Sequence, residues 1–224
     1  RPIIVATEPN TKVYYNDVAT PINLADAGDY YVSDSNTDYY YNDEDLMTLY
    51  ADKPIYVYQP VMSNQADQTQ GMFFVPPINC SAPRTLDMIS DIDRIGAKPF
   101  SGRLNLLVKD TASTIITADG TVIDLSVTPL PNNVNGPYAP DFNINSNIEG
   151  YVAYKILDLS GDISVNSTGE IYVGVFGYNN LAGVGAYFSG FSQVPEIIAA
   201  TAPASFLIAT SSDCPSFIFI LLSL

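Results

Sequence analysis

The sequence predicts an all-β protein built from two tandem, related antiparallel β-sandwich units of jelly-roll-like type. The apolar runs are short and rich in β-branched and aromatic residues, which fit a pleated, half-buried surface. Turn signals recur at intervals of about 8–12 residues, as in sandwiches and barrels. A hairpin-like stretch also occurs twice. Propeller-like blades of a larger protein are the alternative architecture.

The repeated stretch covers residues 54–78 and 170–192. Each copy opens on an apolar run that contains Ile-Tyr-Val, at 55–57 and at 171–173. Each then passes through a polar or glycine-rich turn and ends on glycine followed by aromatic residues. Two runs joined by a turn predict a β-hairpin, and its recurrence predicts an internal repeat.

Four segments follow from this pattern: a first β unit at 1–79, a connector at 80–102, a second β unit at 103–195, and a linker with apolar tail strands at 196–224. The connector is rich in proline and aspartate, and we expect one helical turn in it at 86–89. The second unit contains a hairpin with an Asp119-Gly120 turn, and residues 3–18 are interpreted as its counterpart in the first unit.

The charge balance excludes two classes of partner. The chain carries 24 acidic and 9 basic residues, a net charge of −15. Phosphate backbones and anionic membranes would be repelled, so we expect no nucleic acid partner. No apolar run approaches the roughly 18–20 residues that a membrane-spanning helix needs, so we expect no membrane span.

The chain contains no histidine. This excludes Ser-His-Asp and Cys-His catalysis and every histidine-based metal site. Carboxylate pairs of the glycosidase kind remain available among Asp43, Glu44 and Asp45, or as Asp91 with Asp93. We interpret these as solvated loop acids and expect that the protein is not an enzyme.

Calcium is the better cofactor hypothesis, because it binds several oxygen ligands from acidic loops. Residues 33–45 form the most polar stretch of the chain, although they match no EF-hand spacing. The candidate ligands are Asp34, Asn36, Asp38, Asp43 and Asp45; the alternative is plain surface charge.

Two further features concern covalent and quaternary structure. Cys80 and Cys214 could form a disulfide in an oxidising compartment, or could stay unpaired thiols. The apolar tail could pair with the sheet edge of a neighbouring molecule and so drive assembly. Its candidate assembly residues are Phe217, Phe219, Leu221 and Leu222.

Several phrases together resemble a known family. They lie at 4–11, 24–31, 52–59, 74–77 and 185–191. They are similar to the domain named after the N-terminal region of the IgG-Fc-binding mucin-like protein, over residues 3–195. That domain also occurs in large secreted surface proteins of Bacteroidetes, many of them cargo of the type 9 secretion route used in gliding and adhesion. The resemblance implies an extracellular, non-catalytic, adhesive or structural module, and it fixes no ligand residues.

We therefore expect a secreted bacterial cell-surface protein that acts in adhesion or extracellular assembly. Its partner would be a protein or glycan on a surface, or copies of itself. One alternative is a subunit of an extracellular filament or surface layer, assembled through edge strands. Another is a carbohydrate-binding or carbohydrate-active β protein.

Overall fold

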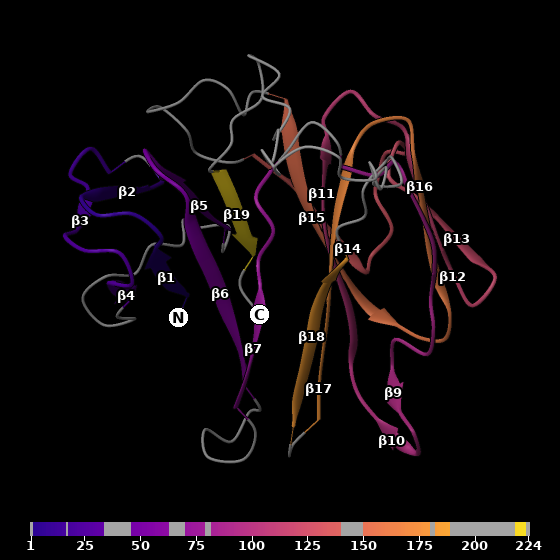
Figure 1. Ribbon diagram of the computed structural model, residues 1–224. Helices are drawn as coiled ribbons and strands as arrows, with labels where there is room; N and C mark the ends of the chain where they lie inside the picture. Colours follow the sequence, from indigo (N-terminus) through magenta and orange to yellow (C-terminus); the bar gives the residue numbers. More distant parts are fainter. Residues whose placement is uncertain are drawn as a thin grey trace, which may run out of the picture.

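The computed structural model describes residues 2–16, 18–33, 46–62, 70–78, 82–139, 150–179, 182–188 and 218–222. Throughout these ranges the regular structure is strand, arranged in five sheets whose pairings are all antiparallel. The predicted all-β, sandwich-type fold is confirmed. Figure 1 shows the strands before residue 79 on one side and those of the second unit on the other.

The N-terminal sandwich consists of two four-stranded sheets. Sheet A has the order β4 (Tyr30–Val32), β1 (Ile3–Ala6), β6 (Ile55–Met62), β7 (Gln70–Phe74). Sheet B has the order β19 (Ile218–Leu222), β5 (Leu46–Ala51), β2 (Thr11–Tyr15), β3 (Ile22–Leu24). Their core contains fully buried side chains from both sheets, among them Ile4, Val13, Leu49 and Val57.

The second sandwich follows the same plan. Sheet C has the order β13 (Thr121–Asp124), β12 (Thr114–Ala118), β16 (Ile163–Ser167), β8 (Thr85–Ile89). Sheet D has the order β14 (Val134–Tyr138), β15 (Tyr151–Leu159), β11 (Gly102–Lys109), β17 (Ile171–Tyr178), β18 (Gly183–Phe188). Strands β9 (Arg94–Ile95) and β10 (Lys98–Pro99) form a separate hairpin. Leu104, Leu106, Ile116, Ile156 and Ile163 are fully buried between sheets C and D.

A third core joins the two sandwiches. Successive strand residues point to opposite faces, so Leu106 packs toward sheet C while Leu107 points away from it. Leu107 belongs to a buried cluster with Tyr151 and Tyr172 of sheet D and Leu46 of β5. Sheet D is therefore covered on both faces, which explains the almost unbroken burial along β11.

Both copies of the repeated hairpin are confirmed as antiparallel pairs, β6 with β7 and β17 with β18. They also lie against each other, with β18 next to β7 and β6 (Figure 1). The rings of Phe73 and Phe176 meet across this contact with centroids 5.2 Å apart. A Cβ at Gly185 would lie within 3.1 Å of side-chain atoms of Val61, Phe73 and Phe176. The repeat thus supplies part of the joint between the sandwiches.

Three sequence-based interpretations need correction or comment. The helical turn expected at 86–89 is wrong: Thr85–Ile89 is strand β8, paired with β16, and Ile89 packs into the core between sheets C and D. Residues 3–18 do not form a hairpin, because β1 belongs to sheet A and β2 to sheet B. The predicted connector at 80–102 contains β8, β9 and β10, and β8 is an edge strand of sheet C.

Tyr151 makes the joint between the sandwiches sensitive to alkaline pH. Burial, together with the nearby Glu170 carboxylate, raises the pKa of its hydroxyl from 10.0 to about 12. A folded pKa above the unfolded value means that stability is intact below pH 10 and is lost as pH rises toward about 12. We expect the free energy of unfolding in urea to fall across this window, and to fall less in Tyr151→Phe. The exposed-site control Tyr30→Phe should retain the full decrease; an equal decrease in all three proteins would contradict this explanation.

Asn105 is buried with only 2% of its surface exposed, and neither its amide oxygen nor its amide nitrogen has a hydrogen-bond partner in the described part of the chain. It lies opposite Lys155 on β15 and Gly174 on β17. An unsatisfied buried amide costs about 1–3 kcal/mol. We expect Asn105→Leu to raise the free energy of unfolding by about 1 kcal/mol, and Asn105→Asp to lower it. A loss of stability in Asn105→Leu, measured by urea unfolding, would show that the amide is satisfied in solution.

Candidate binding face

The outer face of sheet A is apolar where a solvent-facing sheet is normally polar. Ile4 and Val57 are fully buried in the core, so their neighbours along β1 and β6 point outward. Cross-strand register then places the outward side chains in rows, with Tyr30, Val5 and Tyr56 in one row. We name the following set the aromatic face: Ile3, Val5, Tyr30, Val32, Tyr56, Tyr58, Pro60, Met72 and Phe74.

The largest side chains of the aromatic face are strongly exposed. The exposed fractions are 68% for Tyr30, 63% for Met72, 50% for Tyr56 and 43% for Phe74. Together with Val32 they present roughly 500 Å² of apolar surface, the size of the largest patch on a typical monomer. None of the residues of the face carries a charge. Patches of this kind mark interaction sites.

The rings of the aromatic face are held in edge-to-face contact. Phe74 meets Tyr56 and Tyr58 with centroids 6.0 Å apart in each pair and interplanar angles of 66° and 70°. Such pairs stabilise each other beyond their burial, so the surface is preorganised. Phe74 therefore stands edge-on to both tyrosine rings and holds them in place.

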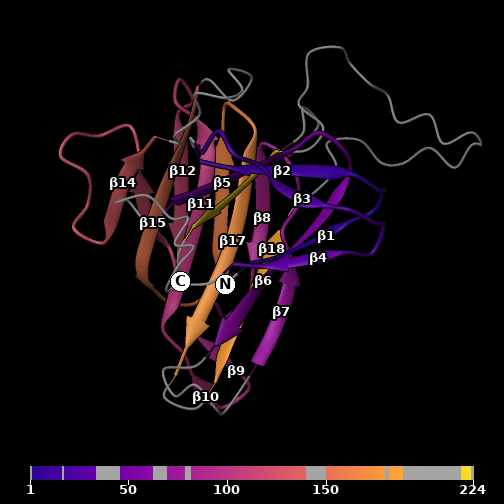
Figure 2. The ribbon, with the colours of Figure 1, turned by 90° about the vertical axis from the view of Figure 1, so that its left-hand side faces the viewer.

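Several charged residues lie at the end of the aromatic face where β4 and β6 begin and β1 ends, as the strand directions show (Figure 2). Asp29 directly precedes β4, and Asp26 donates its N–H to the Asp29 carboxylate at 2.9 Å. Glu8 follows β1, and Asp52 and Lys53 precede β6. Among the described residues of the face, the opposite end carries the uncharged pair Pro60 and Met72; in the sequence Asp34, outside the described residues, follows shortly after β4 at that end.

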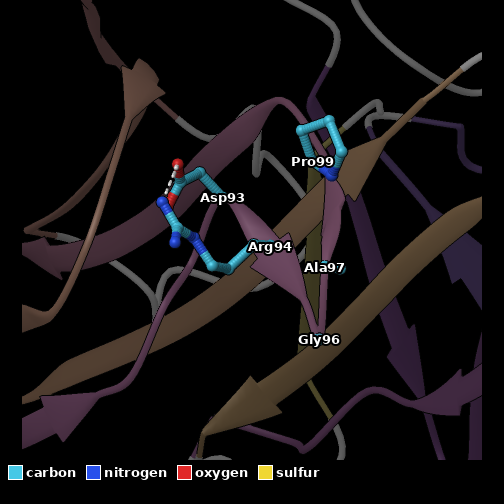
Figure 3. Close-up of a pocket in the computed structure, with 5 residues that line it drawn as sticks. All are labelled: Asp93, Arg94, Gly96, Ala97 and Pro99. Carbon is cyan, nitrogen blue, oxygen red and sulfur yellow. Dashed lines mark ion pairs between the residues drawn. The ribbon is translucent and has the colours of Figure 1, made fainter.

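Asp93 lines a pocket of about 310 Å³ at the β9–β10 hairpin (Figure 3), and Asp91 precedes Asp93 by two residues. The Asp93 carboxylate accepts the N–H of Gly161 at 2.9 Å and lies 4.0 Å from the Arg94 guanidinium. Asp91 has a left-handed backbone conformation and its carboxylate lies 3.8 Å from Arg94. Both carboxylates therefore help to hold the hairpin in place.

Most of the residues singled out from sequence lie outside the described residues. This holds for the five candidate calcium ligands between 34 and 45, for Cys80 and Cys214, and for Phe217, so these sites stay predictions. Phe219, Leu221 and Leu222 lie on β19, which pairs with β5 of the same chain. Across the described ranges, no three acidic or cysteine side chains are grouped in a way that could hold a metal ion.

The sequence contains a signal for the aromatic face. In residues 55–58 tyrosine alternates with aliphatic residues, and Tyr56 and Tyr58 point outward while Ile55 and Val57 pack inward. The tyrosine pair at 30–31 divides in the same way, with Tyr30 exposed and Tyr31 packed against the core. Alternation of tyrosine with aliphatic residues thus indicates which tyrosines share one side of a strand.

The family model of the IgGFc binding protein matches residues 2–177. The chain belongs to the IgGFc-binding family. The match starts just before β1 and reaches into β17, so the family domain comprises the whole of sheet A and most of both sandwiches. A search of curated proteins and a search of solved structures each found no match. In the described ranges, no helix has the length and apolarity needed to cross a membrane.

Proposed function

We propose that this IgGFc-binding-family chain is a non-catalytic binding module of a secreted cell-surface protein, and that it acts in adhesion or extracellular assembly. The observation that carries the proposal is the aromatic face, an uncharged sheet surface with four strongly exposed large apolar side chains. The family is one of binding domains, which supports the same conclusion. The resemblance to type 9 secretion cargo of Bacteroidetes supports an extracellular location.

The partner that fits the aromatic face best is a folded protein. Tyrosine offers a large, rigid contact surface at low entropic cost, which is why it dominates antibody binding sites. The edge-to-face contacts of Phe74 with Tyr56 and Tyr58 hold these rings in fixed positions, which lowers the entropic cost of a contact. The family takes its description from binding of immunoglobulin Fc, but no residue of this chain identifies that ligand.

The experiment compares two double variants with matched exposure. The face variant, Tyr30→Ser with Met72→Ser, alters side chains that are 68% and 63% exposed. The sheet C control, Met88→Ser with Val122→Ser, alters side chains that are 61% and 63% exposed on the other sandwich. Both should fold as the wild type does, because no buried side chain is changed.

Immobilised wild type, face variant and control are probed with a panel of extracellular proteins, which includes immunoglobulin G and the soluble wild-type chain itself, and with polysaccharides. We expect the wild type to bind at least one protein, and the face variant to bind it about tenfold more weakly or worse, since central aromatic contacts dominate interfaces. The control should bind as the wild type does. A wild type that binds nothing on the panel, or equal losses in both variants, would contradict the proposal.

A second candidate function is filament assembly through β19. This strand completes the edge of sheet B by pairing with β5, from Ile218 opposite Tyr50 to Leu222 opposite Leu46. The same pairing made with β5 of another molecule would link subunits. Deletion of residues 216–224 should then abolish assembly and leave the fold intact; an unchanged particle size would exclude this candidate.

Calcium remains a proposal for residues 34–45. A cation that binds only the folded protein would raise its melting temperature by mass action. Melting with calcium and with EDTA therefore tests this site, and equal melting temperatures would exclude it.

A further inference from the structure

We propose that the aromatic face is a self-association surface, on which two copies of this chain pack sheet A against sheet A. The inference rests on the proposed function in that the same face makes the contact, and it names the partner as a second copy. It concerns the faces of the sheets, whereas exchange of β19 would use an edge.

The chain itself shows how such a surface is covered. Sheet D also has an apolar face directed away from its own sandwich, and this face is buried against the neighbouring sandwich through Leu46, Leu107 and Tyr172. The aromatic face has a similar composition of aliphatic and aromatic side chains but remains exposed. Packing of one sheet on another, about 10 Å apart, is the usual way in which such faces are buried.

The area is sufficient for a dimer. Each copy would contribute roughly 500 Å² from the five most exposed side chains alone, and the partly exposed Ile3, Val5 and Tyr58 add to it. The two copies together reach the roughly 1,000 Å² that a specific interface requires. The preorganised rings around Phe74 lower the entropic cost of the contact.

Charge opposes association but does not lie within the contact itself. The net charge of −15 per chain repels a second copy, whereas no residue of the aromatic face is charged. A two-fold axis that lies between the sheets and runs across the strands places the row of Val32, Ile3, Tyr58 and Phe74 against the same row of the other copy. The described acidic residues Glu8, Asp29 and Asp52 then lie away from their counterparts, whereas an axis along the strands would bring them together.

Sedimentation velocity measures the association of the full chain directly. We expect the mass to rise from 24.3 kDa toward twice that value with increasing protein concentration. Association should tighten between about 0.05 and about 0.5 M NaCl, because salt screens the repulsion between two acidic chains. A contact with a basic partner protein would instead weaken with salt.

The face variant should stay monomeric over the same concentrations, while the sheet C control and the chain lacking residues 216–224 should still dimerise. A wild-type monomer at every concentration and salt, a face variant that dimerises, or a dimer that is lost equally in the control would overturn the inference. A wild-type monomer would also be the result if another segment of this chain covers the face. A monomer that still binds a panel protein through the aromatic face would overturn self-association and leave the proposed function standing.

Discussion

Replacing Gly102 with alanine should lower the free energy of unfolding by at least about 3 kcal/mol, near the upper end of what overpacking costs. Gly102 opens β11 and pairs with Leu159, where the β11–β15 register shifts. A Cβ there would overlap the backbone carbonyl oxygen of Leu159 and would lie 3.1 Å from Cγ2 of Ile92. The clash is with backbone, so relief requires that the central pair of sheet D separates.

Gly71→Ala is the matched control, because Gly71 also lies in a strand but a Cβ there meets nothing within 4 Å. We expect Gly71→Ala to be neutral or to stabilise by up to about 1 kcal/mol, since alanine restricts the unfolded chain. Urea unfolding of the two variants provides the comparison. Equal effects in both would show that close approach of β15 does not explain the glycine at 102.

Truncating Leu107 to alanine should cost about 2–5 kcal/mol, the range for a buried leucine. Leu107 is 6% exposed and packs in the core that joins the two sandwiches. Because this core is what couples them, we expect the wild type to melt in one transition and Leu107→Ala to melt in two. Differential scanning calorimetry measures both effects.

Leu106→Ala separates the coupling from simple loss of core packing. Leu106 is the neighbouring residue on β11, but it points into the core between sheets C and D. Leu106→Ala should lower the free energy of unfolding by a similar amount. The variant should still melt in a single transition. Two transitions in the wild type itself would mean that the sandwiches already unfold independently.

The sequence predicted the local features of the fold well. The two Ile-Tyr-Val hairpins and the Asp119-Gly120 turn depend on neighbouring residues, and the structure has β6–β7, β17–β18 and β12–β13 at these places. Asp119 and Gly120 both have positive φ, as the tight turn of such a hairpin requires. Strand propensity and turn chemistry are enough to specify pairings of this kind.

The pairings between strands that lie far apart in the chain could not be predicted from the sequence. Nothing in residues 3–15 shows that β1 pairs with β4 and β6 while β2 pairs with β3 and β5. Likewise Leu86 and Ile89 have a spacing that suits a helical turn, and only pairing with β16 makes the segment a strand. In both cases tertiary contacts decide between alternatives that the local sequence leaves open.

Prediction of the aromatic face as an exposed surface required the same knowledge of non-local contacts. Alternation shows that Tyr56 and Tyr58 share one side of a strand, but not whether another sheet covers that side. On sheet D the equivalent position, Tyr172, is buried by the neighbouring sandwich, whereas Tyr56 is 50% exposed. The two copies of the repeat thus have different environments, and that difference is what creates a candidate binding surface.

Oxidative footprinting of the chain, free and bound to a panel protein or to itself, tests the central claim most directly. The claim is that this protein works through the outer surface of sheet A. We predict that Tyr30, Tyr56 and Met72 become protected on binding while Met88 on sheet C keeps its reactivity. Protection at Met88 with unchanged labelling of Tyr30 and Met72 would contradict the claim.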